Sequence, residues 1–150
     1  MGILQPAVTK EAGGAEGKRL VFGMYQRNGK VITFPVPNRR RSTLIPLILK
    51  HTRRGSIYYS DDFKGYGALS FRGRHHRVLH GKEEYVSGRT HINGIEGFFS
   101  YAKTWLYHYR GVPSQYFHLY LKETEFRFNH RDEDLFGFIA QLLVKLVPNV

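Results

Sequence analysis

A run of thirteen residues, His91 to Lys103, constrains the fold of this chain more than any other segment. Its apolar residues repeat at the spacing of one face of an α-helix: Ile92, Ile95, Phe99 and Ala102. Glu96 and Lys103 are seven positions apart, so a helix would hold a carboxylate and a cation two turns apart on one ridge. The segment therefore predicts an amphipathic helix with one face for a core and a charged ridge beside it.

An apolar run at residues 57–59 precedes an acidic pair, Asp61 and Asp62. The run predicts a buried strand, and strand ends are where open α/β sheets place ligand-binding groups. A carboxylate there, a second on a helix and a lysine two turns further on suit a metal-bound phosphate. A plainer alternative stays open, in which Asp61 is a solvated turn acid and Glu96 and Lys103 are ordinary charges of a helix surface. Asp62 is assigned an exposed or capping position, because only one of the pair can point at a common ion.

Two segments near the N-terminus, residues 20–25 and 31–34, are rich in β-branched and aromatic residues and predict antiparallel strands. Asn28-Gly29 between them favours a tight hairpin turn. Pro35 and Pro37 cannot donate to a strand ladder, so the second strand is expected at the edge of the sheet. Residues 1–17, with breakers such as Pro6, have no periodicity and are interpreted as a flexible tail ahead of one domain at 18–150.

Further elements follow from spacing and capping. Ser42 or Thr43 can cap a helix that tolerates Pro46 in its first turn. A short helical stretch is expected at 63–69, a short strand at 77–80, and helices at 90–109, from about 113, and at 135–147. His91 and Asn93 are expected to shape the start of the 90–109 helix by hydrogen bonding rather than to act chemically.

Three strings resemble a single family: Tyr-Ser-Asp-Asp-Phe-Lys-Gly-Tyr, His-x-Asn-Gly-Ile-Glu-Gly-Phe-Phe-Ser-Tyr-Ala-Lys and Tyr-Leu-Lys-Glu-Thr-Glu-Phe-Arg-Phe-Asn-His-Arg. They are similar to the ISXO2-like transposases of the IS1595 group, which are DDE-type enzymes. The resemblance implies an α/β fold with a ribonuclease-H-like mixed sheet flanked by helices. It also implies that Asp61 and Glu96 are catalytic metal ligands, that Lys103 contacts DNA phosphate, and that two Mg²⁺ (or Mn²⁺) ions support cleavage and strand transfer.

The family carries its first catalytic Asp on the first, central strand of the sheet. This chain has four Asp, and none of them lies in the first sixty residues. Glu11 and Glu16 are the acids available there, and they lie among glycines and alanines without a strand pattern. We therefore expect the central strand to be missing, the metal site to be impaired and the chain to be a catalytically incomplete, truncated transposase. The DNA-binding region that such transposases carry ahead of the core is also not expected.

The charge of the chain favours a polyanionic partner. It has 23 Lys and Arg against 12 Asp and Glu, a formal charge of +11, which points to DNA before an anionic membrane. The candidate phosphate contacts are Arg39, Arg40, Arg41, Arg72, Arg74, Arg77 and Lys103. Solvated loops are the alternative for these basic clusters. The chain has no cysteine, no run long enough to span a membrane and no signal-type segment, so a cytoplasmic, nucleoid-associated prokaryotic protein is expected.

The expected function is DNA transposition through metal-dependent phosphodiester hydrolysis and transesterification, incomplete in this chain. A non-catalytic basic DNA-binding remnant, or an interfering partner of full-length transposases, is the alternative from another class. A metal-dependent nuclease with reduced requirements is a third. Self-association is a further possible partnership.

Overall fold

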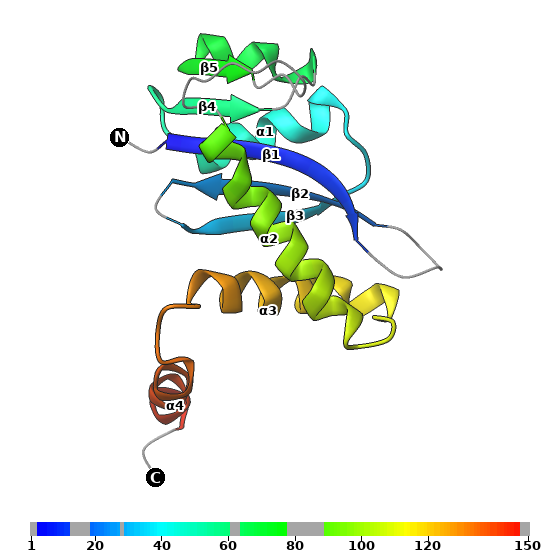
Figure 1. The fold of residues 1–150 in the computed structure, drawn as a ribbon, viewed down its shortest axis with the longest axis vertical. Coiled ribbons are helices and arrows are strands. Elements are labelled where there is room, and N and C mark those ends of the chain that lie inside the picture. Colours follow the sequence, from blue (N-terminus) through cyan, green and yellow to red (C-terminus); the bar gives the residue numbers. More distant parts are fainter. Residues whose placement is uncertain (1–2, 13–18, 28, 61–63, 78–88, 148–150) are drawn as a thin grey trace.

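The strands form one five-stranded sheet in the computed structural model, which describes residues 3–12, 19–27, 29–60, 64–77 and 89–147 (Figure 1). They are β1 (Ile3–Ala12), β2 (Arg19–Gln26), β3 (Val31–Val36), β4 (Ile57–Ser60) and β5 (Arg74–Arg77). Their order across the sheet is β3-β2-β1-β4-β5. β1 pairs antiparallel with β2 and parallel with β4, and β4 pairs parallel with β5, so the sheet is mixed, as expected.

Helices cover both faces of this sheet. They are α1 (Arg41–His51), the 3₁₀ helices η1 (Lys64–Phe71) and η2 (Ser114–Tyr116), and the α-helices α2 (Arg89–Tyr107), α3 (Phe117–Asn129) and α4 (Leu135–Leu146). Among the described residues, no helix has the length and apolar content needed to cross a membrane.

Alternate residues of β2 build two separate cores. Phe22 and Met24 pack with Leu44 and Ile48 of α1 and with the buried residues of η1. Val21, one position earlier, belongs to the other core, together with Ile95, Phe98, Phe99 and Ala102 of α2 and Phe117 and Leu121 of α3. Because successive strand residues point to opposite faces, α1 lies on one side of the sheet and α2 and α3 on the other.

The hairpin and the edge position of its second strand are confirmed. Gly29 has a φ of +94°, and its N–H donates to the carbonyl of Gln26, which closes the turn between β2 and β3. Residue 28 lies outside the described residues. β3 is the outer strand on this side of the sheet, as its prolines predict.

The expectation that the central strand is missing is wrong. Residues 3–12, assigned from sequence to a tail, form β1 between β2 and β4. Pro6 pairs with Met24 despite its missing N–H, and the register shifts between Ala7 and Lys10, an irregularity of the kind where proline is tolerated. An empty central position would leave backbone groups of both neighbouring strands without partners, and this cost outweighs the weak local strand pattern.

Two other boundaries differ from the sequence-based expectation. α1 begins at Arg41, before the expected capping residues Ser42 and Thr43, and it has no side-chain cap. Instead, Asn38 Oδ1 accepts from the Arg40 N–H and the Thr43 hydroxyl, which favours the earlier start. Pro46 consequently lies inside the helix rather than in its first turn. β5 begins at Arg74, three residues before the expected strand at 77–80, because pairing with β4 fixes its start; residues 78–80 lie outside the described residues.

Candidate functional site

The end of β4 is buried between its two neighbouring strands. Tyr58 is fully buried, and its hydroxyl shares a 2.8 Å hydrogen bond with Thr52 Oγ1. Ser60, the last residue of β4, is also buried, and its Oγ is 2.8 Å from Nε2 of His75 on β5. Asp61 and Asp62 follow directly but lie outside the described residues, so the ligand role of Asp61 stays a prediction. Sequence reasoning missed His75, because its segment was interpreted only as basic.

Glu96 and Lys103 lie on α2, which packs against β1, β2, β4 and α3. Three of the four residues of the predicted apolar face, Ile95, Phe99 and Ala102, are confirmed as buried, and the side chain of the fourth, Ile92, lies outside what the structure describes. Glu96 is half-buried and Lys103 is exposed. The helix therefore carries one half-buried acidic residue and presents one cation to solvent about 10 Å further along its axis.

Two glycines allow α2 to approach the sheet closely. A Cβ on Gly23 of β2 would lie 3.1 Å from Cδ1 of Ile95 and 3.2 Å from Cζ of Phe99. A Cβ on Gly94 would overlap the ring of Tyr25, so packing explains the glycine of the His-x-Asn-Gly-Ile-Glu string. Since α2 begins at Arg89, His91 and Asn93 lie within its first two turns. Their side chains lie outside what the structure describes, and their role stays a prediction.

Exposed basic side chains gather around α1 and the turn after it. Arg39, Arg40 and Arg41 are exposed at its start, and Arg74 is exposed on β5. Sequence reasoning missed four more exposed residues of this kind: Lys50, His51, Arg53 and Arg54. The signal was available, because residues 19–60 contain nine Lys and Arg and no Asp or Glu.

Arg72 differs from the other candidate phosphate contacts. Its Nη2 donates to the carbonyls of Leu49 (2.9 Å) and Thr52 (2.7 Å), so its guanidinium caps the end of α1. Among the described residues, its buried Nε has no hydrogen-bond partner. This contact gives Arg72 a role within the fold that sequence reasoning did not assign. The side chain of Arg77, at the end of β5, lies outside what the structure describes.

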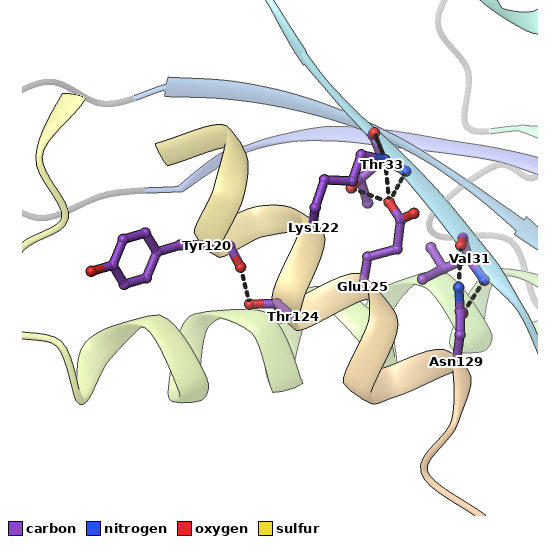
Figure 2. A network of polar contacts seen from close by, with 7 residues as sticks. All are labelled: Val31, Thr33, Tyr120, Lys122, Thr124, Glu125 and Asn129. Atoms are coloured by element: carbon purple, nitrogen blue, oxygen red, sulfur yellow. Dashed lines mark hydrogen bonds and ion pairs between the residues drawn. The ribbon is translucent and has the colours of Figure 1, made fainter. Parts of the chain in front are cut away.

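A second group of polar side chains, here called the α3 clasp, is formed by Lys122, Glu125 and Asn129 (Figure 2). Asn129 Oδ1 accepts from the Val31 N–H (2.7 Å), and its Nδ2 donates to the Val31 carbonyl (2.8 Å). Glu125 Oε2 accepts from the N–H (2.7 Å) and the hydroxyl (2.6 Å) of Thr33. Lys122 Nζ donates to the Thr33 carbonyl (2.8 Å) and to Glu125 (2.7 Å).

The α3 clasp thus takes the place of a neighbouring strand along the free edge of β3. Unpaired edges invite pairing with other chains, and covering them is a common protection. Lys122, Glu125 and Asn129 are spaced three and four residues apart and share one helix face, which is the signal that sequence reasoning missed. The Lys-x-x-Glu-x-x-x-Asn part of the third family string therefore has a structural role.

The one carboxylate that the structure describes at this site, Glu96, suits a divalent metal ion chemically but is too few ligands to hold one. Glu96 offers hard carboxylate oxygens on a supported helix. Within the described ranges, no three His, Asp or Glu side chains form a group that could hold a metal ion. The second expected ligand, Asp61, lies beyond those ranges.

Comparison with known proteins connects this geometry to a family. The model of the ISXO2-like transposase domain matches residues 4–129. An uncharacterized transposase-like protein of Haemophilus influenzae is 37% identical over 116 residues, which cover 77% of this chain and 94% of that protein. An uncharacterized protein in transposable element ISH50 of Halobacterium salinarum is 31% identical over 116 residues, or 75% of this chain and 40% of that protein. This chain therefore spans less than half the length of the second relative.

A solved structure supports the fold separately. The catalytic core domain of BIV integrase matches with a TM-score of 0.51 at 14% identity, covering 72% of this chain and 70% of that chain. The likeness confirms the ribonuclease-H-like fold. DDE transposases generally use divalent metal ions and bind DNA, and the family match supports a role in transposition. The matched domain takes in the sheet, α2 with its Glu96 and the α3 clasp, and the chain belongs to the ISXO2-like transposase family.

Proposed function

We propose that this chain is a DDE-type transposase core whose metal-binding carboxylates are Asp61 and Glu96. The observation that carries the proposal is the parallel pair of β1 and β4 in the sheet, with α2 packed against both strands. Asp61 follows the last residue of β4, and Glu96 is a half-buried residue of α2. A strand end and a packed helix are rigid supports, as a site for phosphodiester chemistry requires.

Asp61 and Glu96 would hold a divalent ion, and Mg²⁺ or Mn²⁺ suits their hard oxygens. Such ions stabilise the charge on the attacking and leaving oxygens of a phosphoryl displacement. Partial burial keeps the Glu96 carboxylate both supported by the fold and open to a ligand. Lys103, exposed two turns further along α2, supplies a cation for a DNA phosphate near these carboxylates.

We further propose that the 150 residues of this sequence do not complete a two-ion site by themselves. β1 pairs Ile3 with Ile57 and Leu4 with Tyr58, and this register continued along both strands sets Pro6 level with Ser60. Neither Pro6 nor the following Ala7 carries a carboxylate. Glu11 is the acid of β1, and it lies five residues beyond Pro6, about 16 Å along an extended strand.

DNA binding is the part of the function that the charge distribution supports best. The exposed basic residues around α1 suit phosphates of a duplex, which carry no sequence information. We expect binding with little sequence preference and an affinity that falls steeply as salt rises, because bound cationic side chains release counterions from DNA. An affinity that is unchanged between low and high salt would contradict this mode of binding.

The test combines metal binding with DNA nicking. The parent chain, Asp61→Ala and Glu96→Ala are each titrated with Mn²⁺ by calorimetry and incubated with labelled duplex DNA and Mg²⁺ or Mn²⁺. We expect the parent chain to bind Mn²⁺ more tightly than either variant, and none of the three to nick DNA.

Two outcomes would change the proposal. Metal-dependent nicking by the parent chain, lost in both variants, would contradict the incomplete site but support Asp61 and Glu96 as its ligands. Equal Mn²⁺ affinity in all three proteins would contradict a metal site formed by Asp61 and Glu96.

A non-catalytic DNA-binding protein is the second candidate function. The stretch of nine basic residues without an acid at 19–60 favours it, because such a surface binds DNA without any metal site. As an interfering partner, this chain would lower the transposition frequency of a full-length family member supplied with it. A variant that lacks two of these basic residues, Arg53→Gln with Arg54→Gln, should then interfere less.

A further inference from the structure

The C-terminal helix α4 carries a row of apolar side chains that the fold leaves uncovered. Phe136, Ile139, Leu143 and Leu146, here called the α4 seam, are spaced three, four and three residues apart. Phe136 is 85% exposed, Leu143 58% and Leu146 77%. None of the twelve residues of α4 is buried. The spacing is that of a helix whose apolar side chains meet another helix.

α4 is joined to the rest of the fold at one end. The ring of Phe138 stacks on those of Phe126 and His130, and Asp134 Oδ1 caps the helix by accepting from the Gly137 N–H. Figure 1 shows α4 at the end of the molecule opposite β5, away from the sheet. The family match ends at residue 129, so α4 lies outside the matched residues.

We propose that the α4 seam binds the same seam of a second copy of this chain, in an antiparallel, two-fold symmetric helix pair. A two-fold interface requires one surface to be complementary to itself, and a uniformly apolar seam meets this condition. The charges at the two ends of α4 favour an antiparallel orientation of the two helices. Asp132, Glu133 and Asp134 are exposed just before the helix, and Lys145 is exposed near its end. Antiparallel pairing brings each Lys145 beside the acidic turn of the other copy.

The distribution of charge also favours this end of the molecule for self-association. Two chains of charge +11 repel each other, and α1, which the basic residues flank in sequence, lies far from α4 (Figure 1). Contact through α4 keeps the two basic regions apart. DNA is a poor occupant for the seam, because α4 has a single charged residue, Lys145.

The size of the seam sets the expected strength. A helix of twelve residues is about 18 Å long. Four apolar side chains from each copy bury less than the roughly 800 Å² per partner of a standard interface. We therefore expect a weak dimer that dissociates on dilution.

The test uses two matched substitutions in neighbouring positions. Leu143→Glu places a charge in the seam, whereas Val144→Glu places it on another face of α4, where Val144 is already 75% exposed. Sedimentation of the full chain over a range of concentrations should show a monomer–dimer equilibrium for the parent and for Val144→Glu. Leu143→Glu should weaken dimerisation at least tenfold, and Lys145→Glu should weaken it by less. Unchanged circular dichroism would show that all variants fold.

Cross-linking gives a second readout, since the chain has no cysteine. With a short bis-maleimide, Ile139→Cys near the middle of α4 should give covalent dimers, and Gln141→Cys on the opposite side of the helix should not. A parent chain that is monomeric at all concentrations would overturn the proposal. So would equal effects of Leu143→Glu and Val144→Glu. Binding of the monomer to phosphatidylcholine vesicles, lost in Leu143→Glu, would assign the seam to a lipid surface instead.

Discussion

Residues 19–60 and residues 117–150 of this chain differ sharply in charge and in what they expose. The first segment, with β2, β3, α1 and β4, has nine Lys and Arg and no Asp or Glu, a formal charge of +9. The second, with α3 and α4, has four Lys and Arg against five Asp and Glu, a formal charge of −1. The first exposes cations around α1, whereas the second exposes apolar side chains on α4.

The difference separates two roles within one small protein, contact with DNA phosphate and support of the fold. The exposed cations beside α1, such as Arg53 and Arg54, face solvent and can contact phosphate, whereas Arg19 at the start of β2 packs over the ring of Phe117. Most charged residues of the second segment bind other groups of the same chain, as the contacts of Lys122 and Glu125 with β3 illustrate. α3 therefore acts as a scaffold for the edge of the sheet, and α1 with its basic surface lies on the opposite face.

Removing the centre of the α3 clasp should have the largest effect. Glu125→Ala leaves the N–H and the hydroxyl of fully buried Thr33 without their acceptor, and we expect a loss of about 2–3 kcal/mol in the free energy of unfolding. Glu123→Ala is the matched control, because Glu123 pairs with Arg127 at the surface and should contribute less than about 1 kcal/mol. Urea denaturation measures both. Equal losses would show that α3 is not a scaffold for β3.

The contact between α2 and the sheet can be tested with two glycines three positions apart. Gly94→Ala forces the Tyr25 ring to move and should destabilise the fold by about 1–3 kcal/mol. A Cβ on Gly97 meets nothing within 4 Å, so Gly97→Ala should stabilise the helix by up to about 1 kcal/mol. Thermal unfolding of the two variants gives the comparison. Stabilisation by both changes would mean that α2 lies further from β2.

The smallest expected effect concerns Tyr101 on α2. Burial raises its pKa above the ordinary 10.0, Arg127 acts in the opposite direction, and Glu123 and Tyr109 raise the pKa further. A raised pKa means that the folded state favours the neutral ring, so this contribution is fully present below pH 10.0 and is lost as pH rises through the raised value. Tyr101→Phe should lose less stability than the parent between neutral and strongly alkaline pH. An identical decline in both proteins would rule out Tyr101 as its source.

The sequence predicted the elements whose own pattern determines them. The apolar spacing in α2 specified its buried face, and Asn28-Gly29 with Pro35 and Pro37 specified the hairpin and its edge strand. The family strings supplied the mixed sheet. Pattern and resemblance together were therefore sufficient for most of the fold.

The features that sequence reasoning missed depend on partners distant in the chain. Residues 3–12 form a strand because β2 and β4 offer hydrogen bonds on both sides, whereas the local sequence, with Pro6 and no periodicity, argued against it. Arg72 caps α1 because the fold brings it to Leu49 and Thr52, some twenty residues away. Spacing on α3 showed that Lys122, Glu125 and Asn129 share a face but not that the edge of β3 lies opposite.

The most direct test of the account is the salt dependence of DNA binding in two double variants that each lose two positive charges. Arg53→Gln with Arg54→Gln removes exposed cations beside α1, and Arg110→Gln with Lys145→Gln removes exposed cations near and on the C-terminal helices. Affinity is measured from low to high salt at concentrations where every protein is monomeric. The first pair should weaken binding and reduce the slope of log K against log salt by up to about 2, while the second leaves both nearly unchanged. Equal effects of the two pairs would contradict a DNA surface centred on the basic residues around α1.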